Sequence, residues 1–140
     1  MNETISPKRQ PASTSVWRNG LRLATGLFFA GVGLHHFLDP APYLAIMPAY
    51  LPLPLELVYL SGFFEILGGI GLLVERTRRW SAWGLIALLA AVYPANINML
   101  VNDIYLPDMP KERWILWLRM PLQFVFGWAV FVSGGLRIRR

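Results

Sequence analysis

Long apolar runs, separated by short polar or charged stretches, make up most of this 140-residue chain. Each of the four longest runs continues for about twenty residues, the length that an α-helix needs to cross the hydrocarbon core of a bilayer. The predicted helices cover residues 17–38, 55–74, 81–99 and 114–133. The pattern therefore predicts an all-α fold, an integral membrane four-helix bundle within residues 16–136.

The segments between and around these apolar runs are not predicted to span the membrane. Residues 39–54 are apolar but carry five prolines, which exclude a continuous helix and predict a short, broken segment. Tyr43 and Tyr50 within it favour a position at the membrane interface, where aromatic residues are enriched. Residues 1–15 are polar and predict a disordered cytoplasmic tail, and residues 137–140 form a basic cytoplasmic tail.

Composition supports a membrane protein, because 55% of the residues are hydrophobic and 15% are charged. The net charge of +5 does not indicate nucleic-acid binding, since the basic residues cluster at the ends of apolar runs and not on one face. The chain has no cysteine. This excludes a disulfide, a thiolate metal site and a dithiol redox pair formed within the chain.

The distribution of Lys and Arg predicts the orientation in the membrane. Ten of the thirteen lie before or in the first two turns of the first helix, between the second and third helices, or after the fourth. The loop between the third and fourth helices holds only Lys111 and Arg113. By the positive-inside rule, both termini are cytoplasmic.

One charged residue lies in the middle of a predicted span. Glu65 follows Leu55 by ten residues, so it lies ~15 Å along the second helix, near the centre of the bilayer. A carboxyl group at that depth is costly unless it is protonated, paired or hydrated, which makes it a functional-site candidate. Glu65 is the best single candidate for a catalytic group, acting as a proton carrier.

Further polar residues fall in the outer half of the other helices, while the inner half is mostly aliphatic. A pocket open toward the outer face follows, and no metal site is predicted because no HxxxH or ExxH spacing is present. The candidate ligand-binding residues are His35, His36, Glu65, Asn96, Asn98, Arg119 and Gln123.

Each candidate also has a structural interpretation. Glu65 and Arg119 could form an ion pair that joins the second and fourth helices. Asp39 could orient the ring of His35, and adjacent histidines point ~100° apart on a helix, so the sequence leaves open which one faces the interior. Asn96 and Asn98 could cap the third helix.

Four segments together resemble the DoxX-like family of small membrane proteins, over roughly residues 24–128. They read FAGVGLHHFLDPAPYLAIMP, YLSGFFEILGGIGLLVERTRRWSAWGLIALL, PANINM and RMPLQ. The resemblance implies a four-helix bundle in the bacterial inner (plasma) membrane. It also implies that the family's polar positions fall on His35 or His36, Glu65, Asn96, Arg119 and Gln123.

Two functions fit these observations. In the first, the outer pocket binds a quinone or another small molecule, and the protein is the membrane component of a redox or stress-response system. As an enzyme it would be a quinone-linked oxidoreductase component, which needs a partner such as a soluble oxidoreductase to supply electrons. In the second, a non-enzymatic protein assists the assembly or regulation of other membrane proteins. Membrane lipids are partners in both, and a homodimer would enlarge the pocket.

Overall fold

The computed structural model describes residues 12–107 and 109–136, and in that part of the chain it is all-helical, with no β-strand. The helices are α1 (Ala12–Leu38), α2 (Ala41–Ile46), α3 (Pro54–Leu73), α4 (Arg78–Val101) and α5 (Arg113–Ser133). All except the short α2 are long and apolar enough to cross a membrane. The predicted all-α fold with four spans is confirmed.

The ends of the helices differ from the predicted ones by a few residues. The largest difference is in α1, which begins at Ala12 and therefore includes residues 12–15 of the predicted disordered tail. No proline or glycine follows Pro11 in that stretch, so nothing in the sequence stops the helix from extending there. The rest of that tail, and the basic tail at residues 137–140, lie outside the described residues.

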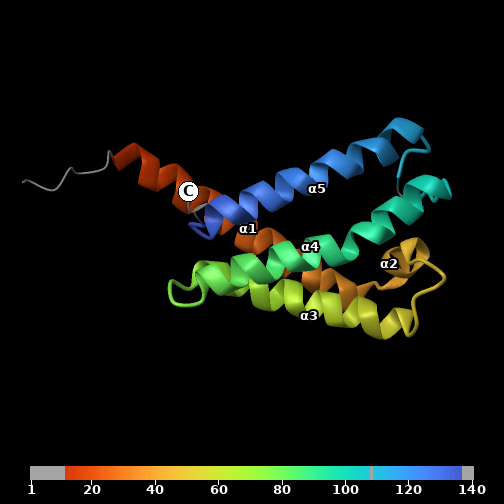
Figure 1. The fold of residues 1–140 in the computed structure, drawn as a ribbon, viewed down its shortest axis with the longest axis horizontal. Helices are drawn as coiled ribbons and strands as arrows, with labels where there is room; N and C mark the ends of the chain where they lie inside the picture. Colours follow the sequence, from red (N-terminus) through yellow and green to blue (C-terminus); the bar gives the residue numbers. More distant parts are fainter. Residues whose placement is uncertain (1–11, 108, 137–140) are drawn as a thin grey trace, which may run out of the picture.

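The four long helices close into a ring, in which the main contacts run from α1 to α3, α3 to α4, α4 to α5 and α5 back to α1. Helices α1 and α3 share the most extensive contact and lie side by side (Figure 1). The turn between α3 and α4 lies at the same end of the bundle as the end of α5, and α2 lies at the opposite end. We call these the α3–α4 end and the α2 end.

Glycines explain why α1 and α3 approach so closely. A Cβ atom built on Gly33 would lie 2.5 Å from the backbone oxygen of Gly62, and one built on Gly69 would lie 2.5 Å from the oxygen of Gly26. Small residues at such positions are a common way for membrane helices to pack, because lipid gives them no hydrophobic driving force for association. This contact sets the depth at which side chains of α1 face those of α3.

Two clusters of buried apolar side chains pack the helices together, one toward each end of the bundle. The cluster at the α3–α4 end takes Phe29, Leu72, Leu85 and Val130 from the four long helices in turn. The cluster at the α2 end joins Ile46 of α2 to Met99 of α4 and Leu116 of α5. Outside these clusters many large apolar side chains are exposed, as expected for helices whose outer faces contact lipid.

The proline-rich segment behaves as predicted in being broken, with α2 its only helix. It is attached to the bundle by Asn98, whose Nδ2 donates to the carbonyl oxygen of Ile46 at 3.0 Å. Helix α4 continues through Pro94, which removes the donor for the carbonyl of Ala90. Gln123 of α5 donates to the neighbouring carbonyl, that of Leu89. A side chain from the next helix thus stabilises α4 one residue from its proline-induced gap.

Candidate functional site

A buried histidine and a buried glutamate meet where α1 and α3 are in close contact. The Nε2 atom of His36 lies 3.5 Å from Oε2 of Glu65. Only 5% of His36 and 7% of Glu65 is exposed. The distance is longer than an ordinary hydrogen bond, and Oε2 has no hydrogen-bond partner among the described residues. A buried polar atom of this kind is rare in folded proteins and indicates a functional role or an absent partner.

The other side of the His36 ring is held by α3. Its Nδ1 atom lies 2.9 Å from the carbonyl oxygen of Val58 and 3.0 Å from the hydroxyl of Ser61, which itself donates to the same carbonyl. Because a carbonyl can only accept, Nδ1 carries a hydrogen in this arrangement. Nε2 faces the Glu65 carboxyl as an acceptor in the neutral imidazole or as a donor in the imidazolium, at a distance too long for an ordinary hydrogen bond. The two titratable groups therefore face each other between α1 and α3, and each can exchange a proton with a group placed beside it.

Tyr43 of α2 covers this pair. Its ring centroid lies 3.7 Å from that of His36, and its hydroxyl lies 3.1 Å from Nδ1 of His35. Burial raises the pKa of Tyr43 above its usual value of 10.0; the charges of Glu65 and Asp39 raise this pKa further, and Arg119 lowers it. Tyr43 therefore lies within electrostatic range of both Glu65 on α3 and Arg119 on α5.

A second polar group lies between α4 and α5. Asn96 donates through Nδ2 to Oε1 of Gln123, which is buried. A cavity of about 200 Å³ adjoins them. Its lining residues are Leu89, Val92, Asn96, Arg119, Leu122, Gln123 and Phe126. This volume is below the ~300–1,000 Å³ of pockets that hold a whole drug-sized ligand, so it suits a small polar head group.

In the structure, five of the candidate residues predicted from the sequence form two separate groups. His36 and Glu65 are brought together, and so are Asn96, Arg119 and Gln123. Their assignment as ligand-binding residues stays a prediction. His35 is exposed, so His36 is the histidine that faces the interior.

Three structural interpretations from the sequence are wrong for the described residues. Glu65 pairs with His36 and forms no ion pair with Arg119, because the close contact of α1 with α3 brings His36 nearer. Asp39 accepts from the backbone N–H of Ala41 at 3.3 Å, and the His35 ring has Tyr43 as its partner.

Asn98 does not cap its helix as the structural interpretation suggested, and its assignment as a ligand-binding residue stays a prediction. Its side chain donates to Ile46 and lines neither described cavity, so it joins α4 to α2. Asn96 bonds to Gln123 on the next helix, which is an interhelical role and not a helix cap. In both residues the amide nitrogen donates to another element, which spacing along one helix does not reveal, and Oδ1 of Asn98 accepts from Nδ2 of Asn102 at the end of α4.

Two residues of the site were not predicted as ligands from the sequence. Ser61 lies one helical turn before Glu65, so it shares the face of Glu65 and could have been identified by that spacing. Tyr43 reaches the site because α2 folds back over the bundle, and no periodic pattern in the sequence predicts this position of α2. Among the described residues, no three His, Cys, Asp or Glu side chains gather in a way that could hold a metal ion.

The fold and the site together define a multi-pass α-helical membrane protein with a buried His–Glu pair in the half of the bundle that is nearer the α2 end. Residues 23–133 match the family described as Domain of unknown function (DUF8561), and the chain belongs to that family. No curated protein and no solved structure matches the chain.

Proposed function

We propose that this protein binds a small amphipathic molecule of the quinone type, whose polar head reaches the His36–Glu65 pair. The observation that carries the proposal is the buried Oε2 atom of Glu65, which has no hydrogen-bond partner in the described part of the chain and lies 3.5 Å from Nε2 of His36. A ligand hydroxyl or carbonyl placed beside this pair would complete its hydrogen bonds. Within the apolar bundle, a ligand that makes these hydrogen bonds would bind in preference to a lipid acyl chain, which cannot make them.

The chemistry suits a molecule that gains or loses protons when it is reduced or oxidised. The pair can pass the proton it holds to a ligand oxygen, or accept one from it. Arg119, Asn96 and Gln123 line a neighbouring cavity and offer donors for a second oxygen. We assign the electrons to a soluble oxidoreductase partner, because no part of the sequence is predicted to bind an electron donor. On that reading the protein lies in the bacterial inner membrane, with the α2 end facing outward.

A titration with decylubiquinone, followed by tryptophan fluorescence in detergent, tests the proposal. We expect Glu65→Gln and His36→Ala to weaken binding by about tenfold or more, because each removes a hydrogen bond to a charged or proton-sharing group. Glu56→Gln is the matched control, since Glu56 lies exposed in the first turn of the same helix. Wild-type protein that does not bind the quinone, or binds it equally after Glu65→Gln, overturns the proposal.

The melting temperature of the same variants separates binding from structure. Because Oε2 of Glu65 makes no hydrogen bond, Glu65→Gln is expected to change the free energy of unfolding by less than about 1 kcal/mol. A purely structural pair predicts the opposite, a loss of several kcal/mol, since breaking a buried ion pair costs about 3–5 kcal/mol.

A second function is favoured by a separate observation on α5. Trp114, Trp117, Phe124 and Trp128 are all more than half exposed, and their spacing places them on one stripe of the helix. We infer as the alternative that this stripe contacts another membrane protein, which this chain helps to assemble. Gentle purification from the native membrane would then yield a stoichiometric membrane protein that is lost when Trp117 and Phe124 are replaced by leucine. Retention of that protein by the double variant overturns the alternative.

A further inference from the structure

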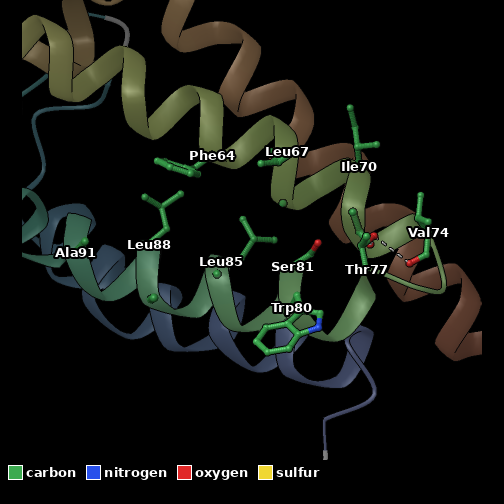
Figure 2. A pocket seen from close by; sticks show the side chains of 14 residues that line it. Phe64, Leu67, Ile70, Val74, Thr77, Trp80, Ser81, Leu85, Leu88 and Ala91 are labelled. Carbon is green, nitrogen blue, oxygen red and sulfur yellow. Dashed lines mark hydrogen bonds between the residues drawn. The ribbon is translucent and has the colours of Figure 1, made fainter.

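A second cavity, larger and almost wholly apolar, runs along the outside of α3 and α4. Its volume is about 760 Å³, and neither His36 nor Glu65 lines it. Figure 2 shows Leu85 and Leu88 pointing from α4 toward α3, with Phe64 opposite Leu88. We call this cavity the α3–α4 groove.

Glycine and alanine residues make up much of the lining of the groove, so little side-chain volume fills it. A Cβ atom on Gly68 would meet the side chain of Leu85 at 2.6 Å, so the helices are in contact there. Gly84 also lines the groove, but a Cβ atom built on it would meet nothing within 4 Å. At Gly84 the groove therefore has unfilled space beside α4.

The groove has the length of one leaflet. Along α3 and its C-cap it extends from Phe64 to Val74, eleven residues that span ~15 Å, and the hydrocarbon core of a bilayer is ~30 Å thick. A transmembrane helix of a second copy would continue across the whole core, whereas an acyl chain of one leaflet ends near the midplane. The length therefore favours a lipid chain over a helix.

The end of the groove near the α3–α4 turn is polar and basic. Thr77 and Ser81 contribute the only hydroxyl side chains of its lining, and Figure 2 shows the Ser81 hydroxyl pointing toward α3. Beside this lining, the turn carries Arg76 next to Glu75, and Arg78 and Arg79 begin α4. Arg76 and Arg79 are exposed, while Arg78 donates through Nε to the carbonyl oxygen of Leu72. Positive charge next to an apolar channel complements a lipid with a negative head group.

We propose that the α3–α4 groove binds one anionic phospholipid, with an acyl chain along Gly84 and the phosphate at the arginines of the α3–α4 turn. The site is separate from the His36–Glu65 pair and does not depend on the function proposed for that pair. An anionic lipid bound here would join α3 to α4 at the end where Trp80, 81% exposed, reaches the interface.

Native mass spectrometry of the purified protein tests this with two lipids that have the same acyl chains, a phosphatidylglycerol and a phosphatidylcholine. We expect one phosphatidylglycerol to bind more tightly than phosphatidylcholine. Gly84→Leu fills the groove and should abolish binding of that lipid. Gly31→Leu is the matched control, because Gly31 is exposed on α1 and its Cβ would also meet nothing within 4 Å. Ala87→Leu, which lines the same groove, is the second filling variant should Gly84→Leu fold poorly.

The charge is tested separately. Replacing Arg76 and Arg79 by glutamine should weaken phosphatidylglycerol binding on the order of tenfold and leave phosphatidylcholine unchanged. Replacing Lys111 and Arg113 by glutamine removes the same charge at the α2 end and should have no effect.

Three results overturn the proposal. Unchanged lipid binding in both filling variants means that the groove is not the site. Equal binding of the two lipids by wild-type protein means that the groove holds a chain without regard to charge. A wild-type dimer in lipid nanodiscs that becomes monomeric on Gly84→Leu means that a second copy occupies the groove.

Discussion

Tyr43 is the residue that connects the two polar groups of the site. Its ring packs against that of His36 at an interplanar angle of 43°, its hydroxyl lies within hydrogen-bond distance of His35, and the charges of Glu65 and Arg119 act on it. Its position on α2, outside the four spans, makes the Pro-rich segment part of the site and not merely a link between helices. A ligand that enters from the α2 end would have to pass this side chain or displace it.

The titration of Tyr43 tests that placement. Burial raises its pKa above 10.0, so we expect the absorbance difference at 295 nm between wild type and Tyr43→Phe to show a midpoint above pH 10. The charges predict two further shifts: Arg119→Gln raises the pKa, because Arg119 lowers it, and Glu65→Gln lowers the pKa. A midpoint that responds to neither substitution would place Tyr43 away from both residues.

The same shift predicts how stability depends on pH. The pKa of Tyr43 is higher in the folded protein than in the unfolded chain, so its contribution to stability is fully present below pH 10. That contribution is lost as the pH rises through the folded pKa, because the unfolded chain releases the proton first. Wild type should therefore lose more stability than Tyr43→Phe above pH 10, in melting curves at matched detergent.

At the scale of helices, the contact of α1 with α3 sets the geometry of the His36–Glu65 pair. The backbone approach at Gly33 and Gly62 lies next to both residues, since a Cβ on Gly33 would also meet Cβ of Glu65 at 2.9 Å and one on Gly62 would meet Cβ of His36 at 2.6 Å. Close approach of these helices and the position of the pair are therefore one feature of the structure.

Substitutions of two glycines of α1 test this contact. Gly33→Ala is expected to destabilise the protein by about 2–4 kcal/mol, because its methyl group would overlap backbone atoms of α3 that cannot move aside freely. Gly31→Ala, on the exposed face of the same helix, should be neutral or stabilising by up to about 1 kcal/mol. Detergent-based SDS unfolding measures both, and equal stability of the two variants would show that the contact is looser than described.

The hydrophobic pattern predicts the helices, but it does not predict which side chains of different helices contact one another. Twenty-residue apolar runs and the prolines of residues 39–54 are local signals, which is why the four spans follow directly from the sequence. The partner of Glu65 depends on which helix lies closest to it at that depth. Depth alone favoured Arg119, while the glycine contact of α1 with α3 brought in His36.

For the molecule as a whole, four spans place the beginning of α1 and the end of α5 on the same side, whichever side that is. The basic residues gather at that side, with Arg22 of α1 donating through Nε to the carbonyl oxygen of Ser133 of α5 at 3.0 Å. The loop between α4 and α5 at the α2 end has fewer basic residues, and its Arg113 is 3.4 Å from Asp103 in an exposed pair. The asymmetry predicts that the α3–α4 end faces the cytoplasm.

Single introduced cysteines can test this orientation directly, because the natural chain has none and needs no prior modification. Glu75→Cys places a thiol in the α3–α4 turn, and Lys111→Cys places one in the loop between α4 and α5, both at exposed positions. On intact cells, a membrane-impermeant maleimide should label Lys111→Cys readily and Glu75→Cys only after the membrane is permeabilised. The reverse labelling would show that the protein has the opposite orientation, with the α2 end and its His36–Glu65 pair on the cytoplasmic side. In that case a ligand would reach the pair from the cytoplasmic side, and the anionic lipid proposed for the α3–α4 groove would come from the outer leaflet.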